Sequence, residues 1–262
     1  MTRRSREVGI IKTCVLGAAC ATALGAPALA DNKLELSATA TLTTDYVFRG
    51  ISQTLNDPAI QGSFDATYGI FYLGAWASNV DFGAAPGPRG VIKPLADLEI
   101  DYYAGITPSW KGITFDIAAL YYTYPSACDA CLGGEFDYFE LKTGASYTFK
   151  EKLTVGITNY WSPEFSGETG EGDALELSAE YAFAGKLFNF FSPSISGLVG
   201  WQWVEDNAGW DPYTYWNVGL TLGFLENWSI DVRYWDTDLS GGDVSAGSIS
   251  EARAVGTLSA SF

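Results

Sequence analysis

The sequence predicts an all-β protein, a transmembrane antiparallel up-and-down β-barrel of about 12 strands. From residue 31 to residue 262, short stretches alternate apolar and polar side chains, and clusters of Gly, Pro, Asn and Asp separate them. A strand with lipid on one side and a polar lumen on the other alternates in this way and crosses the membrane in about ten residues. The chain also starts with an export signal and ends on the aromatic Phe262.

The first 30 residues predict a signal peptide that is removed on export. A basic start is followed by a small and apolar run over 10–25, and residues 28–30 read Ala-Leu-Ala. The apolar run is shorter than the roughly 20 residues that a membrane-spanning helix needs. Lipidation at Cys20 stays open as an alternative. The barrel domain is therefore predicted over 31–262, in the bacterial outer membrane.

Charge and composition limit the expected partners. Without the signal peptide the chain keeps 11 basic and 30 acidic residues, a net charge of about −19. Nucleic acid is excluded as a partner, because binding of its phosphates depends on clusters of Lys and Arg. Nine Trp and an aromatic content of 15% suit the belts at the two membrane interfaces. Outer-membrane lipid, lipopolysaccharide and small solutes or ions are the partners that remain.

Turn residues divide the chain into twelve candidate strands, an even number that suits a bacterial barrel. On the first strand the alternation places Leu34, Tyr46 and Phe48 on the lipid face, and Asp45 and Arg49 on the lumen face. The predicted strands span 34–48, 60–68, 71–80, 95–107, 113–124, 136–149, 153–161, 174–183, 193–204, 213–222, 228–236 and 249–262.

The connections between these strands form two alternating sets. In outer-membrane barrels the long loops face outside, so both termini are expected on the periplasmic side. There the last strand, which ends in Phe262, would meet the barrel-assembly machinery. Short connections lie at 69–70, 108–112, 150–152, 184–192 and 223–227, and long ones at 50–59, 83–94, 125–135, 162–173, 205–212 and 237–248.

Three segments near the start of the barrel carry recognisable motifs. Residues 44–53 read TDYVFRGISQ, residues 61–65 read QGSFD and residues 72–80 read YLGAWASNV. A Glu-x-Asp-x-Tyr spacing follows over 99–103. These motifs, which cover the first third of the chain, resemble the TorF-type porin family of proteobacterial outer-membrane proteins. The resemblance implies an outer-membrane barrel that acts as a channel, and it supplies no substrate and no site residues.

The chemistry of the chain is limited by the absence of histidine. A Ser-His-Asp hydrolase, a His-ligated zinc site and a histidine general base are excluded. Asp97, Glu99 and Asp101 share one face of a strand, and acid-base chemistry by such a carboxylate pair stays open as an alternative. A water-facing lumen wall produces the same spacing. We therefore predict no catalytic residue, no cofactor and no metal, and a protein that is not an enzyme.

The predicted lumen face has more carboxylates than bases. Such a surplus concentrates cations and repels anions, so the sequence predicts a channel for passive diffusion of small solutes that favours cations. One alternative is a closed barrel, filled by paired side chains, that acts in binding or adhesion through its extracellular loops. A specific channel lined by inward Tyr103 and Trp235 is another. The predicted lumen residues are Glu35, Asp45, Arg49, Asp65, Glu99, Asp101, Asp116, Glu140, Lys142, Glu176, Glu180, Asp231, Arg233, Glu251 and Arg253.

Two outer loops carry weaker signals. Cys128 and Cys131 are the only thiols outside the signal peptide, and an oxidising compartment predicts a small loop disulfide, with a redox motif as the alternative. Residues 236–247 begin like a calcium loop, but the twelfth position is Gly247 instead of glutamate. We predict a solvated loop there. Divalent cations that bridge the acidic loops to lipopolysaccharide phosphates stay open.

Overall fold

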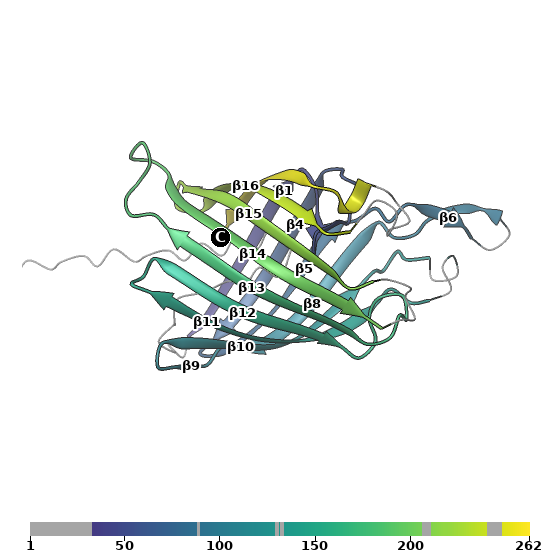
Figure 1. Ribbon diagram of the computed structural model, residues 1–262, viewed down its shortest axis with the longest axis horizontal. Coiled ribbons are helices and arrows are strands. Elements are labelled where there is room, and N and C mark those ends of the chain that lie inside the picture. The colour runs from purple at the N-terminus through teal and green to yellow at the C-terminus, as the bar shows by residue number, and fades with distance from the viewer. Residues whose placement is uncertain (1–32, 88–89, 129–130, 132–133, 206–210, 240–247) are drawn as a thin grey trace, which may run out of the picture.

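The computed structural model describes residues 33–87, 90–128, 131, 134–205, 211–239 and 248–262. The wall strands are β1 (Leu34–Thr43), β4 (Ala59–Tyr68), β5 (Phe71–Asn79), β8 (Leu98–Ile106), β10 (Ile113–Thr123), β11 (Tyr138–Phe149), β12 (Leu153–Ser162), β13 (Gly172–Ala182), β14 (Ser192–Val204), β15 (Tyr213–Phe224), β16 (Trp228–Thr237) and β17 (Arg253–Ser261). Each strand pairs antiparallel with the next, and β17 returns to pair with β1 (Figure 1). The predicted all-β, twelve-stranded closed barrel is confirmed.

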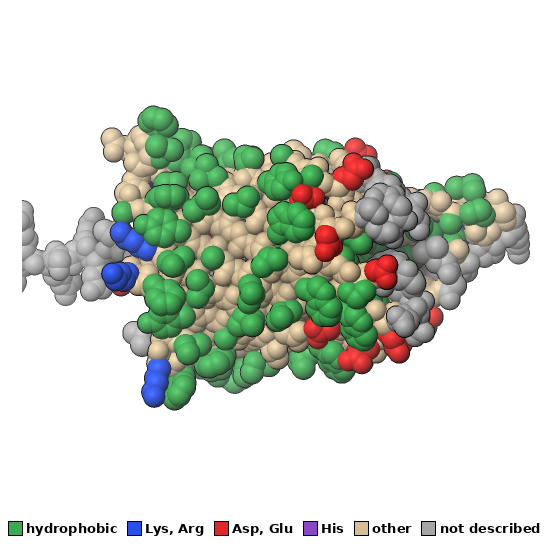
Figure 2. Space-filling model, viewed as in Figure 1, with side chains coloured by type: hydrophobic (Ala, Val, Ile, Leu, Met, Phe, Trp, Pro, Cys, Tyr) green, Lys and Arg blue, Asp and Glu red, His purple; other side chains and the backbone are tan. Residues whose placement is uncertain are grey.

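The side chains of the wall alternate between the outside and the inside of the barrel. On β1, Leu36 and Leu42 are more than half exposed, while Thr39, Thr41 and Thr43 are buried. Apolar side chains cover the outer face of the wall (Figure 2). Such a surface suits contact with lipid, because a soluble monomer rarely exposes so large an apolar area. No helix among the described residues is long and apolar enough to cross a membrane.

The two ends of the barrel differ in loop length and in charge. The tight turn between β4 and β5 and the short β9 (Ser109–Trp110), which pairs with β10, lie at one end, together with the C-terminus. We call this the turn end. The opposite loop end carries the long connections, and β6 (Ala84–Pro86) and β7 (Ile92–Pro94) project from it as a hairpin (Figure 1). In Figure 2, basic side chains gather at the turn end and acidic ones toward the loop end.

The first strand ends earlier than the sequence predicted. Thr43 pairs with Ala59 as the last wall pair of β1 and β4. Residues 44–58, which lie between these partners, leave the wall. Tyr46 is 3% exposed, and Phe48 packs with it against the interior core. The prediction that Tyr46 and Phe48 face lipid is therefore wrong.

Residues 44–58 fold into the barrel, and we call this segment the inward hairpin. Its two short strands are β2 (Val47–Phe48) and β3 (Ile51–Ser52), joined by a two-residue turn. Arg49 (φ 47°) and Gly50 (φ 83°) both adopt positive φ, as the tight hairpin turn requires. A Cβ at Gly50 would meet the side chains of Thr237 and Tyr215 on the wall. Glycine is needed there both for its backbone conformation and for the close approach.

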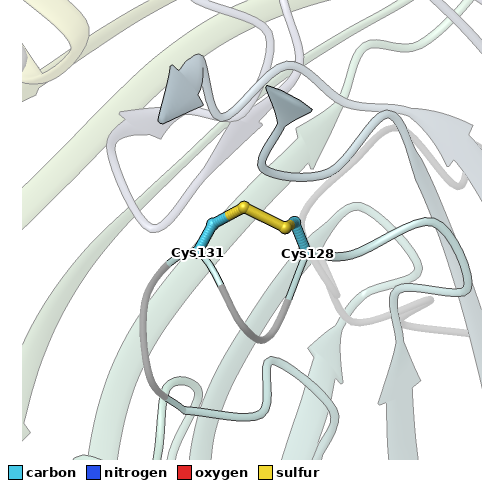
Figure 3. Close-up of a disulfide and its surroundings, with 2 residues drawn as sticks. All are labelled: Cys128 and Cys131. Carbon is cyan, nitrogen blue, oxygen red and sulfur yellow. A yellow bond between two sulfur atoms is a disulfide. The ribbon is translucent and has the colours of Figure 1, made fainter. Parts of the chain in front are cut away.

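Two long connections pack together at the loop end. Phe82 contacts Tyr124 and Phe136, with ring centroids 5.4 and 5.7 Å apart. Cys128 and Cys131 form a disulfide with a Cα–Cα distance of 5.3 Å (Figure 3). The backbone N–H of Cys128 donates to the carbonyl of Leu95 at 2.9 Å. These contacts tie the connection after β10 to the one after β5.

Two strands begin later than predicted, and two predicted segments lie wholly or mostly outside the described residues. β8 begins at Leu98 instead of residue 95. β17 begins at Arg253 instead of residue 249, because the 3₁₀ turn η3 (Ser248–Ser250) occupies the approach to it. The predicted signal peptide over 1–30 and most of the calcium-like loop over 236–247 lie outside the described residues.

Candidate functional site

The tip of the inward hairpin brings a buried cation to the lumen wall. Arg49 is 4% exposed. Its Nη2 donates to Oε2 of Glu140 on β11 at 2.8 Å, and its Nη1 donates to Oε1 of Gln202 on β14 at 2.9 Å. The guanidinium also lies over the ring of Tyr160 on β12, 5.0 Å from its centroid. One side chain thus links the hairpin to three wall strands.

The base of the inward hairpin is held by Asp45. Its Oδ1 accepts hydrogen bonds from the hydroxyls of Ser52 at 2.5 Å and Thr54 at 3.0 Å. Its Oδ2 pairs with Arg253 on β17 at 3.0 Å. Because Asp45 and Arg253 are both largely buried, this ion pair is screened less than a surface pair. The hairpin is therefore fastened at its base as well as at its tip.

Aromatic side chains fill the space between the hairpin and the wall. Tyr46 packs edge-on against Trp76 of β5, with ring centroids 5.3 Å apart, and Phe48 packs likewise against Tyr122 of β10 at 6.0 Å. On the opposite wall, Val47 packs with Tyr215 and Trp235. Tyr122, Tyr160 and Tyr215 are each exposed by 2% or less. The loop-end half of the lumen is closely packed at this level.

Glu99 and Asp101 lie on β8, where Asp101 pairs with Trp76, the residue against which Tyr46 packs. Glu99 is 2% exposed, and its Oε1 accepts a hydrogen bond from the hydroxyl of Tyr124 at 3.3 Å. Burial, and then the charges of Glu99 and Asp101, raise the pKa of the Tyr46 phenol well above its ordinary value. The Tyr46 phenol therefore stays protonated. The enzymatic alternative required a buried pair of neighbouring carboxylates, and Glu99 and Asp101 lie two residues apart on one face of β8.

Toward the turn end the inward side chains are polar, and they range from buried to partly exposed. Lys142 on β11 pairs with Asp116 on β10 at 2.6 Å, and the hydroxyl of Tyr72 donates to the same carboxylate at 2.7 Å. On the other side of the barrel Arg233 pairs with Asp231 at 3.0 Å. These groups form a hydrogen-bonded polar lining below the hairpin.

The structure places most of the predicted lumen residues inside the barrel. Glu35 shares the lumen face of β1 but is exposed at the turn-end start of that strand, where it pairs with Thr67. Glu251 is exposed in the connection before β17, outside the wall strands. Inside are nine acids and four bases, namely Asp45, Asp65, Glu99, Asp101, Asp116, Glu140, Glu176, Glu180 and Asp231, with Arg49, Lys142, Arg233 and Arg253.

Several site residues were missed in the sequence. Gln61, Gln202 and Tyr160 are inward and buried. Period two could have indicated them, since on each wall strand every second residue shares the lumen face. Trp235, which was proposed for a solute track, is inward but packs against the hairpin at 5% exposure. Its place is in the core under the hairpin and not along a path.

The comparison with known families gives a clear assignment. A family described as "Bacterial protein of unknown function (Gcw_chp)" matches residues 27–262. The chain belongs to the Gcw_chp family. No curated protein matches this Gcw_chp chain significantly. The finer resemblance to TorF-type porins stays a prediction.

Solved structures share the fold of this Gcw_chp protein at low sequence identity. The KdgM porin in complex with disordered oligogalacturonate aligns with a TM-score of 0.54 and 9% identity, over 87% of this chain and 98% of that one. The NanC porin in a rhombohedral crystal form gives 0.49 and 9%, over 87% and 99%. LpxR from Salmonella typhimurium gives 0.46 and 8%, over 86% and 99%. The similarity to KdgM shows a porin-like barrel and nothing finer.

Proposed function

We propose that this protein is a channel of the bacterial outer membrane for passive diffusion of small solutes, and that it favours cations. The observation that carries the proposal is the charge inside the barrel, where nine carboxylates face four bases. An acidic lining raises the local concentration of cations and repels anions. The apolar outer face and the long loops at one end support insertion with that end outward.

In this proposal the inward hairpin forms the constriction. Asp65 and Glu180, on the turn-end half, are inward and partly exposed, whereas the side chains around Arg49 are buried. A solute from the turn end would therefore meet a polar lining first and the hairpin next. Resistance to flow is expected to concentrate where Arg49 reaches Glu140.

The test is single-channel conductance of the refolded mature protein in planar bilayers, with reversal potentials in a salt gradient. Discrete cation-selective steps are expected, and the selectivity should weaken in Asp101→Asn because one lumen charge is removed. Glu135→Gln, at an exposed loop glutamate, is the matched control and should leave the steps unchanged at about 1 M salt, where exposed charges are screened. A protein that inserts and never conducts would refute the channel.

A second function, binding or adhesion through the outer loops, is favoured by a different observation. The lumen is closely packed around the inward hairpin, and the β6–β7 hairpin projects beyond the loop end. The disulfide-linked connection after β10 supports the base of that projection through Cys128 and Leu95. The discriminating result is the absence of conductance together with loss of surface binding when residues 84–94 are removed.

A further inference from the structure

Three inward side chains carry buried polar atoms that have no hydrogen-bond partner among the described residues. They are both amide atoms of Gln61, Oε2 of Glu99 and Oδ1 of Asp101. Gln61 is 3% exposed and Glu99 is 2% exposed. Leaving such groups unpaired costs free energy, and the cost is largest for charged carboxylates. Their common position calls for a shared ligand.

The strand register brings these side chains to one level of the wall. Gln61 on β4 pairs with Ser78 on β5, and Ser78 pairs with Glu99 on β8. Gln61 and Glu99 are therefore about 10 Å apart at the backbone, which is two strand spacings, with only the small Ser78 between them. Asp101 follows Glu99 on the same face of β8. Three oxygen-bearing side chains thus share the lumen face of the neighbouring strands β4 and β8 on either side of β5, within two residues of one register level.

The charges in this area are not balanced by a basic side chain. The described residues contain four ion pairs, and neither Glu99 nor Asp101 takes part in one. Arg49 is engaged by Glu140, and Lys142 by Asp116. When both carboxylates are ionised, they carry a charge of −2 without a basic partner. One divalent cation neutralises that charge.

We propose that Gln61, Glu99 and Asp101 bind one hard divalent cation such as Ca²⁺. Carboxylate and amide oxygens are the ligands that such cations prefer, and water completes their coordination. No group of three or more His, Cys, Asp or Glu side chains among the described residues is arranged to hold a metal. The site therefore depends on Gln61 as its third protein ligand. Tyr124, which donates to Oε1 of Glu99, orients that carboxylate from the other side.

The bound cation would also explain how the inward hairpin is supported. Tyr46 packs edge-on against Trp76, which pairs with Asp101 across β5 and β8. A cation bound by Glu99 and Asp101 would reduce the repulsion between these two carboxylates beside the aromatic pair. The cation site rests on the proposed channel function only for its role in permeation, because a cation held here would set the charge at the constriction. Cation binding is measured without conduction, so the cation site and the channel function can fail separately.

The experiment measures bound metal in the mature protein refolded in detergent with Ca²⁺ and separated from free ion by gel filtration. Elemental analysis should give about one tightly held Ca²⁺ more in the wild type than in Glu99→Gln, and Gln61→Leu should weaken binding at least tenfold. Glu135→Gln, at the exposed loop end, should match the wild type. The heat-dependent gel mobility of folded barrels verifies that each variant has folded.

Sensitised terbium emission tests independently where the bound ion lies. Trp76 pairs directly with Asp101 across β5 and β8, so Tb³⁺ in the site should show emission sensitised by Trp76. Trp76→Phe should remove this emission and keep the bound metal, while Glu99→Gln should remove both. Equal metal content in wild type and Glu99→Gln would overturn the site. So would a Glu99→Gln effect that appears only as a change in pH-dependent stability, since protons alone would then neutralise the pair.

Discussion

Arg49 shows how one side chain fastens the inward hairpin to the wall. The residue stands at a hairpin turn with positive φ, and its guanidinium is satisfied by Glu140 and Gln202 on two different wall strands. Burial lowers the pKa of this guanidinium, but the adjacent Glu140 carboxylate more than compensates, so that the pKa is raised. The ion pair therefore persists at every pH at which the barrel is folded and Glu140 is ionised.

Replacement of Arg49 should destabilise the barrel through the charge that it leaves behind. In Arg49→Met, Glu140 stays 1% exposed without its partner, and the free energy of unfolding should fall by about 3–5 kcal/mol. The double variant with Glu140→Met should recover much of that loss, because no buried charge remains. Urea unfolding followed by tryptophan fluorescence measures both, with Lys150→Met at an exposed turn as control. Equal losses in the single and double variants would contradict the role of the ion pair.

The inward hairpin is a separable element of the barrel. Thr43 and Ala59, which flank it, are direct partners in the wall. A two-residue Asn-Gly turn suits a connection between such partners. The wall ladder ends at Thr44, whose N–H donates to the carbonyl of Gly256 on β17 at 3.0 Å. Beyond it the hairpin is held to the wall by Asp45 and Arg49. Wall and hairpin can therefore be altered independently.

Replacing residues 44–58 by Asn-Gly should give a barrel that still folds and conducts severalfold more current per channel. The reason is that Tyr46, Phe48 and Arg49 leave the lumen together. Single-channel recording checks the conductance. The matched control shortens 84–94, the projecting β6–β7 hairpin, whose flanking residues Gly83 and Leu95 already bond at 2.9 Å, and should leave conductance unchanged. An unaltered current in the first variant would exclude the hairpin as the constriction.

The wall could be predicted from the sequence and the inward hairpin could not. Period two follows directly from lipid on one side and water on the other, so Leu36, Leu42 and their counterparts identified the strands. Tyr46 and Phe48 continue the same alternation, and a side chain buried in the lumen is as apolar as one that faces lipid. The sequence contains no sign of which alternative holds. The predicted first strand therefore ran five residues too far.

The contacts between strands could not be predicted from the sequence either. The lumen face of each strand could be read from its own alternation, which predicts Glu99, Asp101 and Glu140 on the face that the structure turns inward. The pairing of Gln61 with Ser78, and of Ser78 with Glu99, depends on register across three strands. Register is set by turns and by packing of the whole sheet. The candidate cation site, which combines these residues, follows only from the structure.

The whole molecule is charged unequally at its two ends. Exposed lysines at positions 111, 150, 152 and 186 lie in the turns, whereas exposed acids such as Glu135, Glu168 and Glu251 lie in the long connections. Figure 2 shows the same separation on one face. An acidic mouth concentrates cations before they enter a lumen. The exposed carboxylates at the mouth and the carboxylates in the lumen would therefore both favour cations. The two contributions would depend differently on ionic strength.

The contribution of the carboxylates at the mouth should depend strongly on salt, because exposed charges are screened. In the triple variant Glu135→Gln, Glu168→Gln, Glu251→Gln, reversal potentials at about 0.01 M salt should show a clearly reduced cation preference, since the Debye length there is ~30 Å. At about 1 M salt the Debye length is ~3 Å, and the variant should match the wild type. Asp101→Asn should lower the preference at both concentrations, because a lumen charge is screened much less. A triple variant that loses its preference equally at both concentrations would show that these glutamates act inside the path and not at its mouth.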